Sequence, residues 1–284
     1  MILRDALRQS IERLDRHGIS SPRLAAEVLL AHCLSADRTY LYTHDEVELT
    51  ASQLQCLEDA TWERASGVPV QYIVGRQEFF GRYFQVNPTV LIPRPETELL
   101  VERVLDLHPA ADSRIIDVGT GSGCIGITLA LELPQTTVCL ADVSFEAVQT
   151  ARSNATNLGA KNISFACMDL LEAAIGPIDV IVSNPPYVSL KETSRLQREV
   201  REHEPHVALF AGDDGLAAYR RLIPRAQQLL RFGGYIAMEV GFGLEPGVLE
   251  LFDQSWEKLQ TRADLQGIPR IVSARLCYKP PAES

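Results

Sequence analysis

From residue 114 onward, short apolar segments alternate with helical segments, and this alternation limits the possible folds more than any other feature. The predicted strands are 114–118, 137–141, 163–167, 179–183 and 234–240, and the predicted helices are 123–132, 144–157 and 214–231. Alternating β and α units favour a parallel sheet covered by helices on both faces. Segments 258–263 and 270–276, around Gly267, predict a final hairpin. The sequence thus predicts an α/β domain that binds its ligand at the carboxyl ends of the strands.

The N-terminal part has a different pattern. Apolar residues recur at helical spacing as far as Gly18, a second helix is predicted to begin at Ser21-Pro22, and a third runs from about Thr50 to Trp62. Residues 71–90 are rich in aromatic and β-branched residues punctuated by glycine, which predicts a hairpin. We therefore expect a helical bundle at 1–75, a linking hairpin at 76–90 and the large domain at 91–284.

A glycine-rich loop follows the first predicted strand, in the segment from Asp117 to Gly123. Glycine permits positive φ and lets the backbone approach a ligand closely. Asp142, at the tip of the next predicted strand, is placed to accept both hydroxyls of a ribose. Gly121-x-Gly123-x-x-Gly126 also matches a dinucleotide fingerprint. However, the turn begins at Gly119, so Gly126 would lie inside the helix, and no residue suited to hydride chemistry stands out.

Two further positions belong to this predicted nucleoside site. Asp169 follows the third predicted strand and is either a helix N-cap or an acceptor for an adenine amino group, with Leu170 packing on the ring. In an earlier segment, Pro95-Glu96 suits the first turn of a helix, where an acid complements the helix dipole, and Glu96 and Thr97 are interpreted as helix-capping residues. That interpretation is compatible with a further role in lining a pocket.

The tetrapeptide Asn184-Pro185-Pro186-Tyr187 follows the predicted strand 179–183. Proline fixes φ, lacks an N–H and restricts the residue before it, so the strand must end here and the backbone is held stiff. The Asn184 side-chain oxygen and the Pro185 carbonyl would form a fixed pair of acceptors beside the Tyr187 ring. An ordinary proline turn is the alternative. The complete tetrapeptide, in a chain with a nucleoside-type loop, favours a site for a planar group that carries an NH2.

Composition restricts the partners. The net charge is −10 and the chain has no Lys/Arg cluster, which argues against binding nucleic acid through its phosphates. No apolar run is long enough to cross a bilayer and no secretion signal is recognisable, so we expect a cytoplasmic protein without membrane partners.

The six cysteines are scattered, and we expect reduced packing residues rather than disulfides or zinc ligands. Pro205 interrupts His203-x-x-His206, so no metal is expected.

Several motifs occur together along the whole chain. They are Gln71-Tyr72-Ile73-x-Gly75, Glu78-Phe79-x-Gly81, the segment from Leu91 to Glu98, the glycine loop, the Asn-Pro-Pro-Tyr tetrapeptide, Glu204-Pro205, Asp214-Gly215-Leu216 and Tyr219-Arg220. Together they resemble the bacterial protein-(glutamine-N5) methyltransferases that modify class 1 peptide-chain release factors. The Arg94-Pro95-Glu96-Thr97-Glu98 segment distinguishes this family from the related ribosomal-protein glutamine methyltransferases. One departure is Leu244, where the family often has glutamine.

The resemblance implies a class I S-adenosylmethionine-dependent methyltransferase fold: a Rossmann-like, doubly wound, mostly parallel seven-stranded sheet with a small helical bundle and a linking hairpin. It implies S-adenosyl-L-methionine as the cofactor, bound by Gly119, Thr120, Gly121, Ser122, Gly123, Asp142, Asp169, Leu170 and Asn184. It implies the glutamine of a Gly-Gly-Gln loop as the substrate, contacted by the catalytic residues Asn184, Pro185, Pro186 and Tyr187. The bundle and hairpin would hold the release factor, and we expect a monomer.

Two other functions stay open from the sequence. Adenine N6 in nucleic acid also offers a planar NH2 to such a tetrapeptide, although the acidic balance argues against it. A nucleoside-binding adaptor that docks through its helical bundle is a non-enzymatic alternative.

Overall fold

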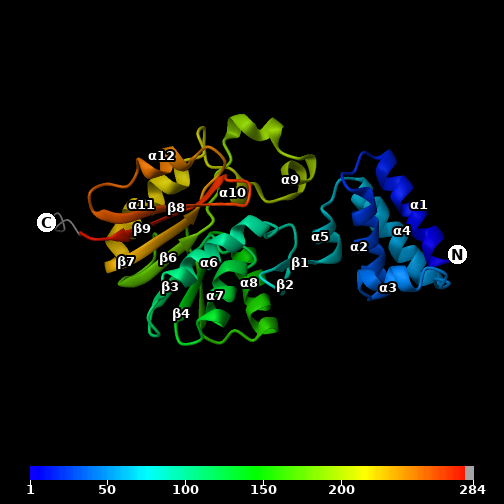
Figure 1. The fold of residues 1–284 in the computed structure, drawn as a ribbon, viewed down its shortest axis with the longest axis horizontal. Helices are drawn as coiled ribbons and strands as arrows, with labels where there is room; N and C mark the ends of the chain where they lie inside the picture. Colours follow the sequence, from blue (N-terminus) through cyan, green and yellow to red (C-terminus); the bar gives the residue numbers. More distant parts are fainter. Residues whose placement is uncertain (279–284) are drawn as a thin grey trace. The chain divides into compact units, whose positions relative to one another are not determined.

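In a computed structural model, which describes residues 1–278, the chain divides into two compact units (Figure 1). The first comprises Met1–Arg76 together with Gln197–His203, and the second comprises Gln77–Leu196 and the chain from Glu204 onward. The sequence did not indicate that 197–203 would join the N-terminal unit. The assignment of substrate recognition to 1–75 stays a prediction.

The first unit is helical. Its elements are α1 (Leu3–Arg16), α2 (Pro22–Leu34), α3 (Arg38–Thr43), α4 (Ala51–Ala65), α5 (Val70–Val74) and α9 (Arg198–His203). Leu3, Leu29 and Leu57 bury the apolar faces of α1, α2 and α4 against one another, which confirms the three predicted long helices. In α9, Glu199 pairs with the buried Arg64 of α4 at 2.6 Å.

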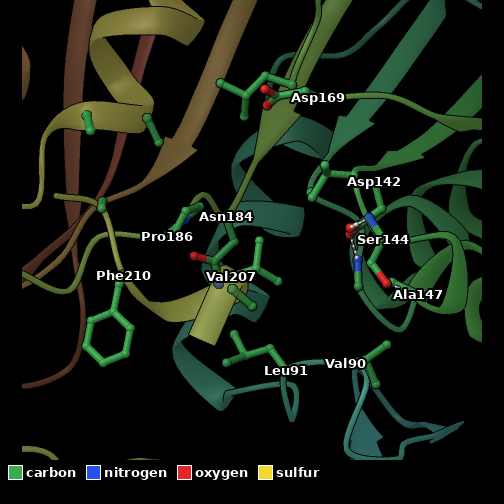
Figure 2. Close-up of a pocket in the computed structure, with 18 of the residues that line it drawn as sticks. Val90, Leu91, Asp142, Ser144, Ala147, Asp169, Asn184, Pro186, Val207 and Phe210 are labelled. Atoms are coloured by element: carbon green, nitrogen blue, oxygen red, sulfur yellow. Dashed lines mark hydrogen bonds between the residues drawn. The ribbon is translucent and has the colours of Figure 1, made fainter. Parts of the chain in front are cut away.

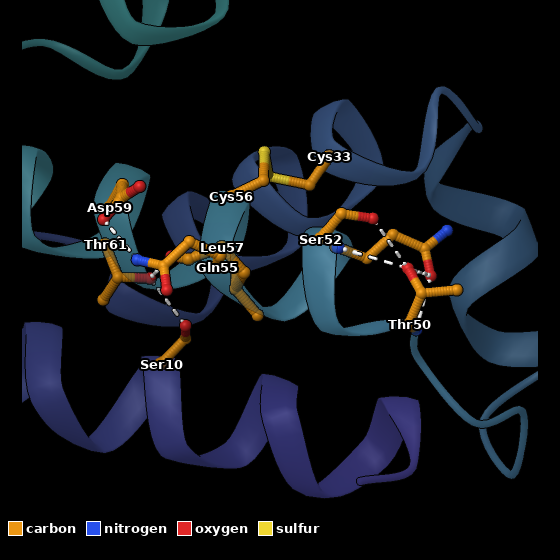
Figure 3. Close-up of a disulfide and its surroundings, with 10 residues drawn as sticks. Ser10, Cys33, Thr50, Ser52, Gln55, Cys56, Leu57, Asp59 and Thr61 are labelled. Atoms are coloured by element: carbon orange, nitrogen blue, oxygen red, sulfur yellow. Dashed lines mark hydrogen bonds between the residues drawn. A yellow bond between two sulfur atoms is a disulfide. The ribbon is translucent and has the colours of Figure 1, made fainter.

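A disulfide joins α2 to α4 (Figure 3). Cys33 and Cys56 are bonded, with their Cα atoms 5.8 Å apart, so the prediction that all six cysteines are reduced is wrong for this pair. Packing of the two helices brings the positions into the range that a disulfide requires. Their separation of 23 residues carries no such signal. The other four cysteines, all within the described part of the chain, are free thiols.

The predicted hairpin is present but shorter than its β-type sequence suggested. It consists of β1 (Arg76–Phe79) and β2 (Arg82–Gln85), which form a two-stranded sheet. Phe79 and Phe84 are buried in the same apolar cluster as Leu100, so the hairpin packs on the core of the large unit. The preceding 70–74 segment is helix α5, because Pro69 and Gly75 bound a short helical turn there.

The described residues of the second unit form a seven-stranded sheet. Its strands are β3 (Arg114–Val118), β4 (Thr137–Asp142), β5 (Ile163–Cys167), β6 (Ile178–Ser183), β7 (Leu230–Glu239), β8 (Trp256–Ala263) and β9 (Pro269–Leu276). The strand order is β5-β4-β3-β6-β7-β9-β8. Neighbours from β5 to β7 are parallel, and β9 is antiparallel to both β7 and β8. This confirms the predicted class I methyltransferase fold, including the final hairpin.

Helices cover both faces of the sheet. One apolar cluster contains residues of α6 (Glu98–Asp106), α7 (Cys124–Glu132) and α8 (Phe145–Leu158), and the other contains residues of α11 (Ala217–Leu229) and α12 (Glu245–Leu249). Ile115 belongs to the first cluster and Ile116 to the second, because successive strand residues point to opposite faces. Helix α11 is shorter than the predicted 214–231, and β7 begins at Leu230, before the predicted 234.

Short helical elements complete the unit: η1 (Pro95–Thr97), η2 (Leu190–Arg195) and α10 (His206–Leu209). Proline occupies the first position of η1, as predicted. Among the described residues, no helix combines the length and the apolar character needed to cross a membrane.

Candidate active site

A cavity of about 400 Å³ lies at the carboxyl ends of β3, β4, β5 and β6 (Figure 2). Six of the predicted cofactor residues line it: Gly119, Gly121, Asp142, Asp169, Leu170 and Asn184. Apolar side chains from loops elsewhere in the sequence, including Leu91 and Phe210, complete the lining. Strand ends that are far apart along the chain therefore meet at one site, as the parallel sheet predicts.

The buried carboxylate of Asp117 fixes the glycine loop through two hydrogen bonds. Asp117 Oδ2 accepts a hydrogen bond from the Thr120 hydroxyl at 2.6 Å and from the Gly126 N–H at 2.9 Å. Burial raises the pKa of Asp117 to about 7. Gly126 lies inside α7, where an added Cβ would come within 2.8 Å of Leu140 Cδ1. Gly126 is therefore a packing residue, as predicted.

The loop residues divide into two groups. Thr120 and Ser122 are buried, and a Cβ at Gly123 would lie 2.6 Å from Ile127 Cδ1, so these three residues shape the loop from inside. Gly119 and Gly121 instead line the cavity with positive φ. A Cβ at Gly121 would meet no atom of the described residues within 4 Å. Backbone at this position is thus open to a ligand.

Asp142, at the end of β4, is fixed by two backbone donors. Its Oδ2 accepts from the Gly121 N–H at 2.9 Å and its Oδ1 accepts from the Ser144 N–H at 2.9 Å (Figure 2). Burial raises the pKa of Asp142, and these backbone bonds lower it. A carboxylate oxygen can accept more than one hydrogen bond. Asp142 can therefore bind two vicinal hydroxyls without releasing its backbone partners.

Asp169 has a partner that the sequence did not reveal. Arg221 of α11 donates to Asp169 Oδ2 at 2.7 Å and to Glu172 Oε1 at 2.6 Å, and Arg221 itself lines the cavity. The backbone at Asp169 forms a turn rather than a helix start, so the N-cap interpretation is wrong. Leu170 beside it has φ +48°. A non-glycine residue in the left-handed region is uncommon and is concentrated at functional sites.

Asn184 lies directly after β6 and is held by a buried chain of hydrogen bonds. Its Nδ2 donates to Thr97 Oγ1 at 3.3 Å, and the Thr97 hydroxyl donates to Glu239 Oε2 at 2.6 Å. Thr97 precedes α6, but its side chain does not cap that helix, so the capping interpretation is wrong for Thr97. One N–H of the carboxamide is thus engaged by Thr97, so the nitrogen end of the group faces Thr97 and Asn184 Oδ1 is left for a ligand. Neither Thr97 nor Glu239 was predicted as part of this network.

Of the tetrapeptide, Asn184 and Pro186 line the cavity (Figure 2). Pro185 is buried, and Tyr187 is not among the residues of the lining. The Tyr187 hydroxyl donates to Glu239 Oε1 at 3.5 Å, and burial raises the pKa of Tyr187, so the phenol stays neutral. Its ring packs on Gly241, where a Cβ would lie 2.7 Å from Cδ2. Leu244 Cδ1 would lie 3.1 Å from the same Cβ, which places the departure from the family pattern beside this ring.

Comparison with known proteins gives matches over nearly the whole chain. The family model described as the PrmC N-terminal domain matches residues 5–75, and the one described as the methyltransferase small domain matches 95–203. The release factor glutamine methyltransferase of Koribacter versatilis is 45% identical and is matched over 97% of this chain and 99% of its own. The enzyme with the same name from Chlorobaculum tepidum is 41% identical, over 95% of each chain.

Among solved structures, the catalytic domain of hMettl16 in complex with the MAT2A 3'UTR hairpin 6 superposes with a TM-score of 0.57. It covers 79% of this chain and 84% of its own at 19% identity. At that identity the likeness shows the fold alone.

Proposed function

Because the chain belongs to the release factor glutamine methyltransferase family, we propose that it methylates a glutamine side-chain amide nitrogen in class 1 peptide-chain release factors. The proposed substrate is the glutamine of their Gly-Gly-Gln loop, and the proposed methyl donor is S-adenosyl-L-methionine. The proposed location is the cytoplasm, with the helical unit helping to hold the release factor and the enzyme acting as a monomer.

One observation carries this proposal: Asn184 and Pro186 line the same cavity as Gly119, Gly121 and Asp142. A nucleoside held by the glycine loop and Asp142 would therefore share its cavity with an amide held by Asn184. A planar NH2 group at this position has an acceptor in Asn184 Oδ1, because the nitrogen of that side chain is bound to Thr97.

The lining fits the proposed cofactor. The open backbone at Gly121 and the fixed carboxylate of Asp142 suit a ribose. Leu170 offers an apolar surface for an adenine ring, and Asp169 carries a second carboxylate oxygen beyond the one that binds Arg221. When bound, the cofactor supplies a methyl carbon on a positively charged sulfur; the nitrogen–carbon bond forms as the sulfur–carbon bond breaks, and the nitrogen releases one proton to water.

The residues of the chain would overcome the low reactivity of an amide. Its nitrogen is a poor nucleophile because the lone pair is delocalised into the carbonyl. Asn184 Oδ1 and the Pro185 carbonyl, by accepting one N–H each, would orient the nitrogen and stabilise the positive charge that develops on it. Pro186, which lines the cavity, would support one face of the planar amide, and Tyr187 behind it would hold the tetrapeptide in place. No strong base is needed before attack, since the N–H becomes acidic only afterwards.

Mass spectrometry tests the proposal. The enzyme is incubated with S-adenosylmethionine and a class 1 release factor, and the Gly-Gly-Gln peptide is sequenced. We expect one methyl group on the glutamine, none when that glutamine is replaced by alanine, and none on double-stranded DNA. Asn184→Ala should lower turnover roughly 10²- to 10³-fold. An unmodified glutamine, or near-normal turnover in Asn184→Ala, would contradict the proposal.

A further inference from the structure

We propose that Glu239 and Thr97 are positioning residues that determine which end of the Asn184 carboxamide faces the substrate. The inference deepens the proposed function and rests on it for its catalytic meaning. Both residues are 2% exposed and neither lines the cavity, so they would act through Asn184 rather than on the substrate.

The Thr97 hydroxyl has a single proton to donate. Thr97 Oγ1 is 2.6 Å from Glu239 Oε2 and 3.3 Å from Asn184 Nδ2. An ionised carboxylate can only accept, so the hydroxyl must donate its proton to Glu239. The same oxygen can then only accept from Asn184, and the group that donates is the NH2 of the carboxamide. Ionised Glu239 therefore directs Asn184 Oδ1 towards the cavity.

A protonated Glu239 would remove this constraint. The acid could donate its own proton to Thr97 Oγ1, and the hydroxyl proton would become free to point at Asn184. The carboxamide could then turn over and accept from Thr97 through Oδ1. Its NH2 would face the NH2 of the substrate, and two donors cannot bond to each other. The orientation of Asn184 is thus linked to the charge on Glu239.

Charged and polar groups from several elements act on Glu239 or are affected by its charge. They are Thr97 and Glu96 of η1, Arg270 of β9, the Tyr187 hydroxyl, the Tyr219 hydroxyl of α11 and Cys124 of α7. The Tyr219 hydroxyl donates to the Glu239 backbone carbonyl at 2.8 Å. Burial raises the pKa of Glu239 to about 7, although the Thr97 hydroxyl and Arg270 lower it. The change of charge therefore falls within the range where the enzyme can be assayed.

Substitution of Thr97 tests the hydrogen-bond chain. Thr97→Val removes the hydroxyl at nearly constant volume, and we expect kcat to fall about 10- to 100-fold with KM for the release factor changed less than about threefold. Thr97→Ser restores the hydroxyl and should recover most of the rate. Thr136→Val is the matched control, because it removes a buried hydroxyl that donates only to the Leu133 carbonyl, at 2.8 Å. Equal rates for the Val and Ser variants at Thr97 would overturn the proposal.

The pH profile tests the role of charge. In the wild type, kcat should decrease as pH falls through about 7, because Glu239 gains a proton. Glu239→Gln cannot ionise, and its amide can either donate to Thr97 or accept from it. We expect about tenfold lower kcat at pH 8 and a profile without the decline near pH 7. Wild-type kcat in this variant, or an unchanged acid limb, would overturn the proposal.

A readout that needs neither substrate nor cofactor separates this inference from the proposed function. The ¹⁵N-labelled side-chain NH2 signal of Asn184 should shift in Thr97→Val and not in Thr136→Val. It should also move with pH near 7 in the wild type but not in Glu239→Gln. If the signal behaves so and no glutamine is methylated, the proposed function fails and the positioning network stands. If methylation occurs but neither Thr97→Val nor Glu239→Gln changes the behaviour of the Asn184 signal, the positioning role is wrong and the proposed function stands.

Discussion

Adding one methyl group at Gly241 should lower kcat without altering any of the residues proposed to bind the cofactor. A Cβ there would lie 2.7 Å from Tyr187 Cδ2 and 3.2 Å from Cγ. Carbon atoms in contact prefer about 3.5–4.0 Å, so the ring must retreat by roughly 0.8 Å or more. It cannot do so freely, because the ring packs against the buried cluster that contains Tyr219 and Met238 and its hydroxyl also contacts Glu239 Oε1 at 3.5 Å. A displacement of about 1 Å at a positioning group can cost about 100-fold in rate.

We therefore expect Gly241→Ala to lower kcat about 100-fold while the affinity for S-adenosylhomocysteine changes less than about threefold. Turnover is measured by mass spectrometry of the release-factor peptide, and affinity by calorimetry. Gly247→Ala is the matched control: its Cβ would come within 2.9 Å of Leu216 Cδ1, the end of a flexible side chain, and Tyr187 is not involved. Near-normal kcat in Gly241→Ala would refute the idea that the Tyr187 ring must be held in place.

Three further perturbations test other parts of the account. Asp142→Ala should weaken S-adenosylhomocysteine binding about 10- to 100-fold, because the ribose loses its charged acceptor; unchanged affinity by calorimetry would exclude the ribose role. Burial raises the pKa of Asp117 from 3.8 to about 7. Between about pH 4 and 7 the Asp117 carboxyl is therefore protonated in the folded protein but ionised in the unfolded chain, so the free energy of unfolding falls as pH rises through this range. The free energy of unfolding should therefore drop between pH 5 and 8 by about 2–3 kcal/mol more in the wild type than in Asp117→Asn; identical slopes in urea titrations would contradict this. Reduction of the Cys33–Cys56 disulfide, which closes a loop with a separation of 23 residues, should destabilise the helical unit by about 3 kcal/mol; melting that is insensitive to reductant would show that the bond contributes nothing.

The sequence predicted the parts of the fold that local patterns determine. The sequences of β3, β4 and β6 are mostly apolar because these strands are buried between two helical layers, whereas β5, at the edge of the sheet, has no fully buried residue. The start of β7 was placed too late, since Gly233 and Gly234 indicate a break, whereas the strand passes through them with Gly233 at φ +82°. The register with β6 shifts there, from Ile178–Leu230 to Val180–Tyr235, so the glycines form an irregularity within one strand and pairing on both sides of it keeps the strand continuous.

Much of the site was predictable for the same reason. Gly119, Asp142 and Asn184 each stand at the end of a strand, and a parallel sheet brings such positions together. The contact between Thr97 and Glu239 was not predictable, because the two residues are 142 positions apart and nothing local requires that they meet. The pairing of Cys33 with Cys56 depends in the same way on how two helices pack.

The most direct test of the central claim is a structure of the enzyme with S-adenosylhomocysteine and a Gly-Gly-Gln peptide of the release factor. The account predicts that the glutamine amide nitrogen lies about 2.9 Å from both Asn184 Oδ1 and the Pro185 carbonyl oxygen, with Asn184 Nδ2 still bound to Thr97. A glutamine seated elsewhere, or an Asn184 whose nitrogen faces the substrate, would contradict it.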